Sequence, residues 1–145
     1  MKFNEFYSLT IVHSRDIILV KGVDYMNITK QKSQKTFDKQ AADYDTNIQG
    51  EHARKLYKPI IENLKNKNIH SILDLGCGTG ALLKEIKELN IAEQLFGIDI
   101  SPNMLEIAKN KLGNDATLIL GDSERLPFED SSFDAIVCND SFHHY

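Results

Sequence analysis

The sequence predicts an α/β protein with a Rossmann-like, doubly wound parallel sheet of about four strands and helices on both faces. Short apolar runs of strand length alternate with amphipathic stretches of helix length over residues 72–138, which is typical of parallel sheets with helical crossovers. The first run, Ile72–Leu75, enters a turn with glycines at positions 76, 78 and 80, directly before a helical pattern. Acidic or amide side chains lie at the ends of the expected strands, where open parallel sheets bind ligands.

The composition is typical of one soluble domain. A length of 145 residues allows a single sizeable core. The net charge of −4, from 17 basic and 21 acidic residues, gives no support for nucleic-acid binding. No apolar run approaches the roughly 18 residues of a membrane span, and no secretory signal is recognisable. The two cysteines, Cys77 and Cys138, lack metal-type spacing and favour a reducing, cytoplasmic location without a bound metal.

Residues 1–29 differ from the rest of the chain and are expected to form an N-terminal arm of unclear role. The arm mixes aromatic and β-branched residues, and its run Ile17–Val20 is a candidate short strand. Met26 is a candidate alternative start. The domain itself is expected over residues 30–145.

Two helices are expected between the arm and the first strand. Residues 30–44 are polar, with Phe37 and Tyr44 on one helical face, which predicts an amphipathic helix packing two rings on the core. A second helix is expected over Gln49–Leu64, and Pro59 is expected to kink or divide it.

The glycine turn at residues 76–80 predicts a nucleotide-binding corner. Glycines allow a tight turn and leave no Cβ between the backbone and a ligand. The next helix shows its apolar face at Leu82, Leu83, Ile86 and Leu89. Free N–H groups at the start of that helix favour an electronegative ligand. A plain tight turn is the alternative, and three alternating glycines between strand and helix disfavour it.

A dinucleotide site is a second interpretation of the same turn. Gly76-x-Gly78-x-x-Ala81 satisfies the looser NAD fingerprint, which allows alanine at its last position. Two residues argue against NAD. Asp74 lies inside the strand, where a dinucleotide-binding strand usually carries an apolar residue, and Gly80 is a glycine that the fingerprint does not require.

Three further strands and a helix follow in the second half of the chain. Leu95–Ile100 is the next expected strand, and Ser101 with the proline after it predicts a helix start. Gly113 is expected to cap the end of that helix. Thr117–Gly121 and Phe133–Cys138 are the third and fourth expected strands.

The residues at the strand ends are candidates for ligand binding. Asp99 comes 19 residues after Gly80, about where an acid reaches ribose hydroxyls in nucleotide-binding sheets. Asp122 could accept a hydrogen bond from an adenine amino group. Asp74 and the pair Asn139-Asp140 end two other strands. Any one of these residues alone could be a solvated loop residue, but their shared edge of one sheet favours a binding site.

Four segments in order resemble class I S-adenosylmethionine-dependent methyltransferases, in the methyltransferase-domain group that includes ubiquinone/menaquinone-type enzymes. The segments are Leu73–Gly80, Gly97–Leu105, Gly121–Phe128 and Phe133–Asn139. The resemblance covers residues 35–145 and implies S-adenosyl-L-methionine as cofactor, with S-adenosyl-L-homocysteine as product. The implied cofactor-binding residues are Tyr44, Asp74, Gly76, Cys77, Gly78, Gly80, Asp99, Ile100, Met104, Asp122, Ser123 and Asn139.

The resemblance also implies a role for each part of the site. The turn glycines would border the methionine and ribose portion, with Asp74 and the Asn139 main chain near the methionine amino group. Asp99 would bind the ribose hydroxyls. Tyr44 resembles a tyrosine that closes over the cofactor.

The adenine end would be formed by residues after the second and third strands. Ile100 and Met104 would sandwich the ring, and Asp122 and Ser123 would bind its edge.

Methyl transfer from a sulfonium is an in-line displacement that positioning of the acceptor can largely catalyse. No catalytic triad is therefore required. His143 and His144 are weak candidates for a general base, and contact with the acceptor or with solvent is the favoured alternative. The acceptor is expected to be a small molecule, which the sequence does not identify.

The resemblance also implies a sheet with more strands than this chain supplies. The fourth strand, at Ala135–Val137, is therefore expected to be an exposed apolar edge, open to pairing in a homodimer. A cofactor-binding or interaction fragment without catalysis of its own is the alternative to an active methyltransferase. A fragment of an NAD-dependent oxidoreductase is a third, less favoured alternative.

Overall fold

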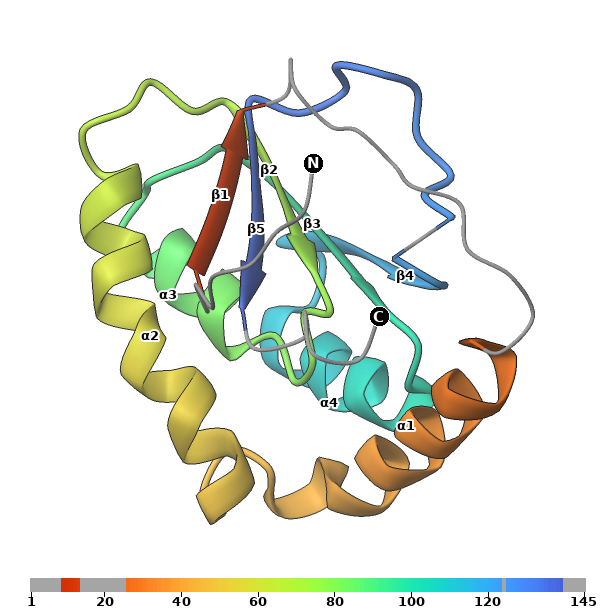
Figure 1. The fold of residues 1–145 in the computed structure, drawn as a ribbon. Helices are drawn as coiled ribbons and strands as arrows, with labels where there is room; N and C mark the ends of the chain where they lie inside the picture. The colour runs from red at the N-terminus through yellow and green to blue at the C-terminus, as the bar shows by residue number, and fades with distance from the viewer. Residues whose placement is uncertain (1–8, 14–25, 124, 140–145) are drawn as a thin grey trace.

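The computed structural model describes residues 9–13, 26–123 and 125–139 (Figure 1). One five-stranded sheet has the order β1-β5-β2-β3-β4. Its parallel strands are β2 (Ser71–Leu75), β3 (Gln94–Asp99), β4 (Ala116–Leu120) and β5 (Ala135–Asn139). The predicted α/β fold with a Rossmann-like parallel sheet is confirmed, and each predicted strand forms within one or two residues of its expected place.

The four α-helices of the described residues occur in the predicted order and differ from the prediction at their ends, and a short 3₁₀ helix that was not predicted follows the first. They are α1 (Met26–Gln40), the short 3₁₀ helix η1 (Ala41–Asp43), α2 (Ile48–Leu64), α3 (Ala81–Glu88) and α4 (Pro102–Leu112). The start expected at residue 30 falls inside α1, so the helix extends into the predicted arm. Pro59 lies inside α2 without dividing it.

The two faces of the sheet are covered in different ways. One apolar cluster joins β-strand residues to α2, α3 and α4, through residues such as Leu64, Leu83 and Leu112. The other cluster contains Leu73, Ile98, Phe133 and Ile136, with side chains of the β4–β5 connection packed against it. Helices were expected on both faces, and in the described residues the β4–β5 connection fills the second face, where its Phe128 and Phe133 pack edge-on against Phe96 of β3.

The strand β1 (Leu9–His13) corrects the prediction of an exposed fourth strand. β1 pairs antiparallel with β5, with Leu9 opposite Asn139 and His13 opposite Ala135. Both edges of β5 are thus paired, one by β2 and one by β1 (Figure 1). The expected exposed edge is wrong, and a homodimer through it has lost its basis.

The sheet register places the strand ends of the predicted site side by side. Leu75 of β2 pairs with Ile98 of β3 and with Cys138 of β5. β2 and β5 point their carboxyl ends toward the connection between α1 and α2 (Figure 1). Within the described ranges, no helix is both long and apolar enough to cross a membrane. The run Ile17–Val20 lies outside the described residues.

Candidate functional site

A pocket lies at the carboxyl ends of β2, β3 and β5, between the glycine turn and the helices α1 and α2. Every cofactor-binding candidate of the sequence analysis except Gly80 lines it. The lining also includes residues that the sequence did not indicate, namely Lys30, Ser33, Phe37, Ala53, Tyr57, Thr79 and Leu82. The parallel sheet has therefore gathered the predicted residues at one place, as expected for an open α/β sheet.

The glycine turn is held by hydrogen bonds to the end of β3, at Ile98 and Asp99. The N–H groups of Gly76 and Cys77 donate to the carbonyl of Ile98, at 2.8 and 3.1 Å. The N–H of Gly78 donates to Asp99 Oδ2 at 2.8 Å, and Gly78 has a positive φ of 53° with open space around its missing Cβ. These three N–H groups therefore hold the turn against the end of β3.

Gly80 has a packing role. It has a φ of 74°, and a Cβ there would lie 2.8 Å from Leu112 Cδ1 and 3.1 Å from Ala108 Cβ. The absence of a side chain thus lets α3 begin against α4. Gly80 is not among the residues that line the pocket.

Asp99 is fixed at the end of β3 with its carboxylate in the pocket. Its Oδ1 accepts from the N–H of Ser101 at 2.9 Å, and its Oδ2 from that of Gly78 at 2.8 Å. Burial raises the pKa of Asp99, and backbone hydrogen bonds, chiefly from Ser101 and Gly78, oppose that rise. A carboxylate has about four acceptor positions, so Asp99 is oriented by the backbone and retains capacity for ligand hydroxyls.

Asp74 and Asn139 present unmatched acceptors to the pocket. Asp74 is 2% exposed, and its Oδ1 has no hydrogen-bond partner among the described residues. Burial, followed by the charge of Asp99, raises the pKa of Asp74 well above its usual value. Asn139 donates through Nδ2 to the carbonyl of Ala53 at 3.1 Å. This bond fixes the orientation of the amide, so the buried atom without a partner is the acceptor Oδ1.

These two acceptors come from neighbouring parallel strands of one pocket. An unmatched buried polar atom is costly in free energy, and most native ones have a partner. A positively charged donor, such as an ammonium group, is the kind of partner these oxygens lack, and one beside Asp74 would lower its pKa again.

The opposite end of the pocket combines apolar and charged side chains. Ile100 and the buried Met104 line it beside Asp122 and Ser123. Lys30 of α1 forms an ion pair with Asp122, with 2.7 Å between Nζ and Oδ2. This part of the pocket therefore combines two apolar side chains with polar and charged ones.

The residues missed by the sequence analysis come mainly from helix faces. Lys30, Ser33 and Phe37 follow helical spacing along α1, and Ala53 and Tyr57 are one turn apart in α2. Their spacing fits a shared helical face, but nothing local distinguishes a pocket wall from core packing.

The ring of Tyr57 is largely buried at the pocket. Burial, and secondly the charge of Asp74, raise its pKa, so its phenol is neutral at physiological pH. His143 and His144 lie outside the described residues, so their role stays a prediction. Among the residues that the structure describes, no cluster of histidine, cysteine and acidic side chains has the geometry to bind a metal ion.

Comparison with known protein families shows the family to which the chain belongs. The family described as a methyltransferase domain matches residues 72–145, about half of the sequence. The chain belongs to the methyltransferase-domain family. The resemblance to class I S-adenosylmethionine-dependent methyltransferases is thereby confirmed.

Curated relatives of this methyltransferase-domain chain carry different acceptor names. A demethylmenaquinone methyltransferase of Thermotoga maritima is 34% identical over 120 residues, which are 81% of this chain and 52% of the relative. A malonyl-[acyl-carrier protein] O-methyltransferase of Priestia megaterium is 35% identical over 118 residues, which are 79% of this chain and 42% of the relative. The chain thus spans about half the length of the curated relatives it matches.

Solved structures of methyltransferases share the fold. A chain of the complex between the Haloferax volcanii Trm112 methyltransferase activator and a methyltransferase has a TM-score of 0.55 and 29% identity, covering 68% of this chain and 44% of that one. The plantazolicin methyltransferase in complex with a desmethyl analogue and SAH has a TM-score of 0.56 and 26% identity, covering 76% of this chain and 46% of that one.

Proposed function

We propose that this chain binds S-adenosyl-L-methionine in the pocket and is the cofactor-binding part of a methyltransferase. The two unmatched buried acceptors, Asp74 Oδ1 and Asn139 Oδ1, are the observation that carries the proposal. The methionine portion of the cofactor has an ammonium group, which is the type of donor these atoms lack. The named methyltransferase relatives and the SAH complex of a similar structure support the same cofactor.

The other pocket residues fit the remaining parts of the cofactor. Asp99, oriented by two backbone N–H groups, would accept hydrogen bonds from the ribose hydroxyls. Ile100 and Met104 would contact the two faces of adenine, and Asp122 and Ser123 its edge. Tyr44, with its ring 6.2 Å from that of Phe37 between centroids, would cover the cofactor from the α1 side.

The bound cofactor supplies a sulfonium-linked methyl group with a good leaving group. The chain's residues would therefore act by binding and orientation, since a well-aligned nucleophile accounts for much of the rate of such a displacement. Transfer to a small-molecule acceptor is part of the proposal for the whole protein. The different names of the relatives leave the identity of that acceptor open.

The proposal also distinguishes the cofactor from NAD. Asp74 lies inside β2 with its carboxyl group facing the pocket. A dinucleotide has no ammonium group to donate to the unmatched oxygens of Asp74 and Asn139, since the charged ring nitrogen of nicotinamide carries no hydrogen, and its pyrophosphate adds negative charge. We therefore expect selectivity for the sulfonium cofactor.

Calorimetric titration tests the proposal with S-adenosyl-L-methionine, S-adenosyl-L-homocysteine and NAD in parallel. The first two are expected to bind, and Asp99→Ala is expected to weaken both at least about tenfold, because a charge-assisted hydrogen bond contributes about 1.5–3 kcal/mol. Asp115→Asn is the matched control, since Asp115 is exposed and pairs with Lys87 away from the pocket. NAD binding alone, or no binding by a folded chain, would contradict the proposal.

A further inference from the structure

The segment between α1 and α2, residues 41–47, contributes Tyr44 to the pocket lining and is here named the lid segment. We infer that Asp45 is a positioning residue that fastens the lid segment to the glycine turn and to α4, and that this attachment retains the bound cofactor by keeping Tyr44 at the pocket. The inference rests on the proposed function, since S-adenosyl-L-homocysteine serves as the ligand in its test.

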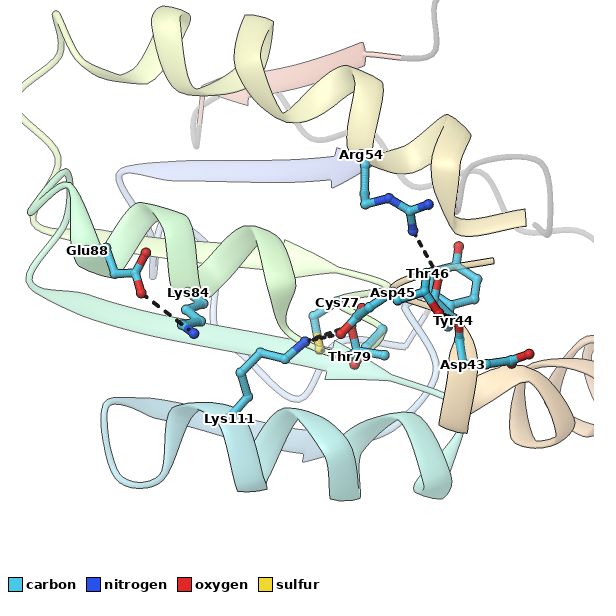
Figure 2. A network of polar contacts seen from close by, with 11 residues as sticks. Asp43, Tyr44, Asp45, Thr46, Arg54, Cys77, Thr79, Lys84, Glu88 and Lys111 are labelled. Atoms are coloured by element: carbon cyan, nitrogen blue, oxygen red, sulfur yellow. Dashed lines mark hydrogen bonds and ion pairs between the residues drawn. The ribbon is translucent and has the colours of Figure 1, made fainter. Parts of the chain in front are cut away.

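Asp45 is bonded to two elements that are distant in sequence (Figure 2). Its Oδ1 accepts from the hydroxyl of Thr79 in the glycine turn, and its Oδ2 accepts from Lys111 Nζ in the last turn of α4, at 2.6 Å. Lys111 Nζ also donates to Thr79 Oγ1 at 3.2 Å. The three side chains form a closed triangle, so the lid segment, the glycine turn and α4 meet at one point.

Within this triangle, Asp45 and Lys111 form an ion pair. Burial raises the pKa of Asp45, but hydrogen bonds from Lys111 and Thr79 and the charges of Lys111 and Arg54 outweigh burial and lower the pKa overall. Asp45 is therefore ionised at neutral pH. Thr79 is 3% exposed and the side chain of Lys111 18% exposed, so two of the three partners are largely shielded from water and salt.

A second attachment holds the lid segment on the side of α2. Arg54 donates from Nη1 to the carbonyl of Tyr44 at 3.0 Å and from Nη2 to the carbonyl of Asn47 at 2.9 Å. A Cβ at Gly50 would lie 2.0 Å from the Tyr44 carbonyl oxygen. The backbone of Tyr44 therefore runs directly against the first turn of α2, with no room for a side chain between them.

Tyr44 connects these attachments to the pocket. It is the residue next to Asp45, its carbonyl is held by Arg54, and its side chain lines the pocket. The lid segment is thus attached at both sides, next to the residue that it contributes to the pocket. Release of a ligand from under the ring of Tyr44 requires the lid segment to move, and the Asp45 bonds oppose that movement.

The test measures how fast pre-bound tritiated S-adenosyl-L-homocysteine leaves the protein after a chase with excess unlabelled ligand. Asp45→Asn keeps the shape of the side chain but removes its charge, and is expected to raise the dissociation rate about tenfold, as for loss of a charge-assisted hydrogen bond. Lys111→Gln attacks the same triangle from α4 and is expected to act in the same direction. Glu88→Gln is the control, because it removes an exposed ion pair with Lys84 on α3 (Figure 2).

A double-mutant cycle with Tyr44→Ala separates positioning from general stabilisation. If Asp45 acts through Tyr44, Asp45→Asn has less than about a twofold effect on dissociation in the Tyr44→Ala background. An equal effect in both backgrounds, or an unchanged rate in Asp45→Asn and Lys111→Gln, would overturn the inference. Failure of the unaltered chain to bind the ligand would instead overturn the proposed function, so the two failures are distinguishable.

Discussion

Asp74 is a buried carboxyl group whose charge the ligand-free protein does not compensate. It is 2% exposed and has an unmatched oxygen. We expect Asp74→Asn to raise the free energy of unfolding of the chain without ligand at pH 7 by about 1–3 kcal/mol, because a neutral amide costs less to bury than a carboxyl group that must lose its charge or stay unpaired. The same substitution is expected to weaken cofactor binding, because the amide cannot neutralise an ammonium group.

The pH dependence of this effect follows from the sign of the shift. The pKa of Asp74 is raised in the folded chain above its ordinary value of 3.8, so between these pKa values the folded chain binds more protons than the unfolded one. Stability from this group therefore falls as pH rises above 3.8. The stabilisation by Asp74→Asn is expected to grow over that range in urea unfolding curves, with Asp115→Asn as control. If the stability difference between Asp74→Asn and the unaltered chain did not change with pH, folding would not raise the pKa of Asp74.

The acids of the site were predictable from sequence, whereas the walls of the pocket were not. Asp74, Asp99 and Asp122 follow from two general rules, the strand pattern and the binding edge of open sheets. Lys30 and Tyr57 come from helices whose docking depends on contacts between distant parts of the chain. Their roles require the packed structure, because a helical face toward a pocket has the same spacing as one toward the core.

At the scale of elements, two glycines of one turn have separable tasks. Gly80→Ala would force a side chain against Leu112 and Ala108 in a left-handed backbone, and is expected to lower the free energy of unfolding by about 2–5 kcal/mol. Gly78→Ala meets no neighbouring protein atom and is expected to lower it by only about 1–2 kcal/mol.

The two substitutions should rank in the opposite order in their effect on cofactor affinity, measured on the folded molecules of each variant. Gly78 lines the pocket and Gly80 does not, so Gly78→Ala is expected to lower cofactor affinity more. Urea unfolding and calorimetry of both variants provide the comparison. Equal losses of stability would show that the contact between α3 and α4 tolerates a methyl group.

Sequence patterns located elements well where the signals are local. The start of α4 is an example, since Ser101 accepts from the N–H of Met104 as an N-cap and the proline occupies the first turn. Phe37 was expected in the core and lines the pocket instead. β1 was missed because strand pairing depends on a partner far away in sequence, and strand propensity alone decides little.

At the scale of the whole molecule, β1 covers an edge of the sheet that would otherwise be open. We expect a chain that starts at Met26 to self-associate through β5, because an unpaired apolar strand edge is a template for pairing. Light scattering after size-exclusion chromatography should give a larger mean mass for the shortened chain than for the full chain at equal concentration.

The remaining edge supplies the internal control for this experiment. Among the described residues β4 pairs only with β3, so any association through β4 occurs in both chains and cancels in the comparison. A synthetic peptide spanning Leu9–His13 is expected to reduce the mass of the shortened chain again. An unchanged mass after removal of residues 1–25 would contradict the expectation.

The overall architecture could be predicted from the order of strands and helices in the sequence. The segments that cover the sheet could not. The parallel strands β2–β5 were each indicated by a local apolar run. The cover of the second face by the β4–β5 connection depends on how Phe128 and Phe133 pack on Phe96. Such packing is a property of the folded chain and leaves no local periodic signal.

The antiparallel pair of β1 and β5 also has a consequence for the time course of synthesis. A ribosome makes β1 before every other described strand and β5 after every other one. During translation β1 therefore has no native partner until nearly all of the described chain has been made, and contacts this distant in sequence form slowly. Throughout that interval the nascent strand is available to chaperones and to other nascent chains. The sheet is therefore completed only when β1, the first described strand to be made, pairs with β5, the last.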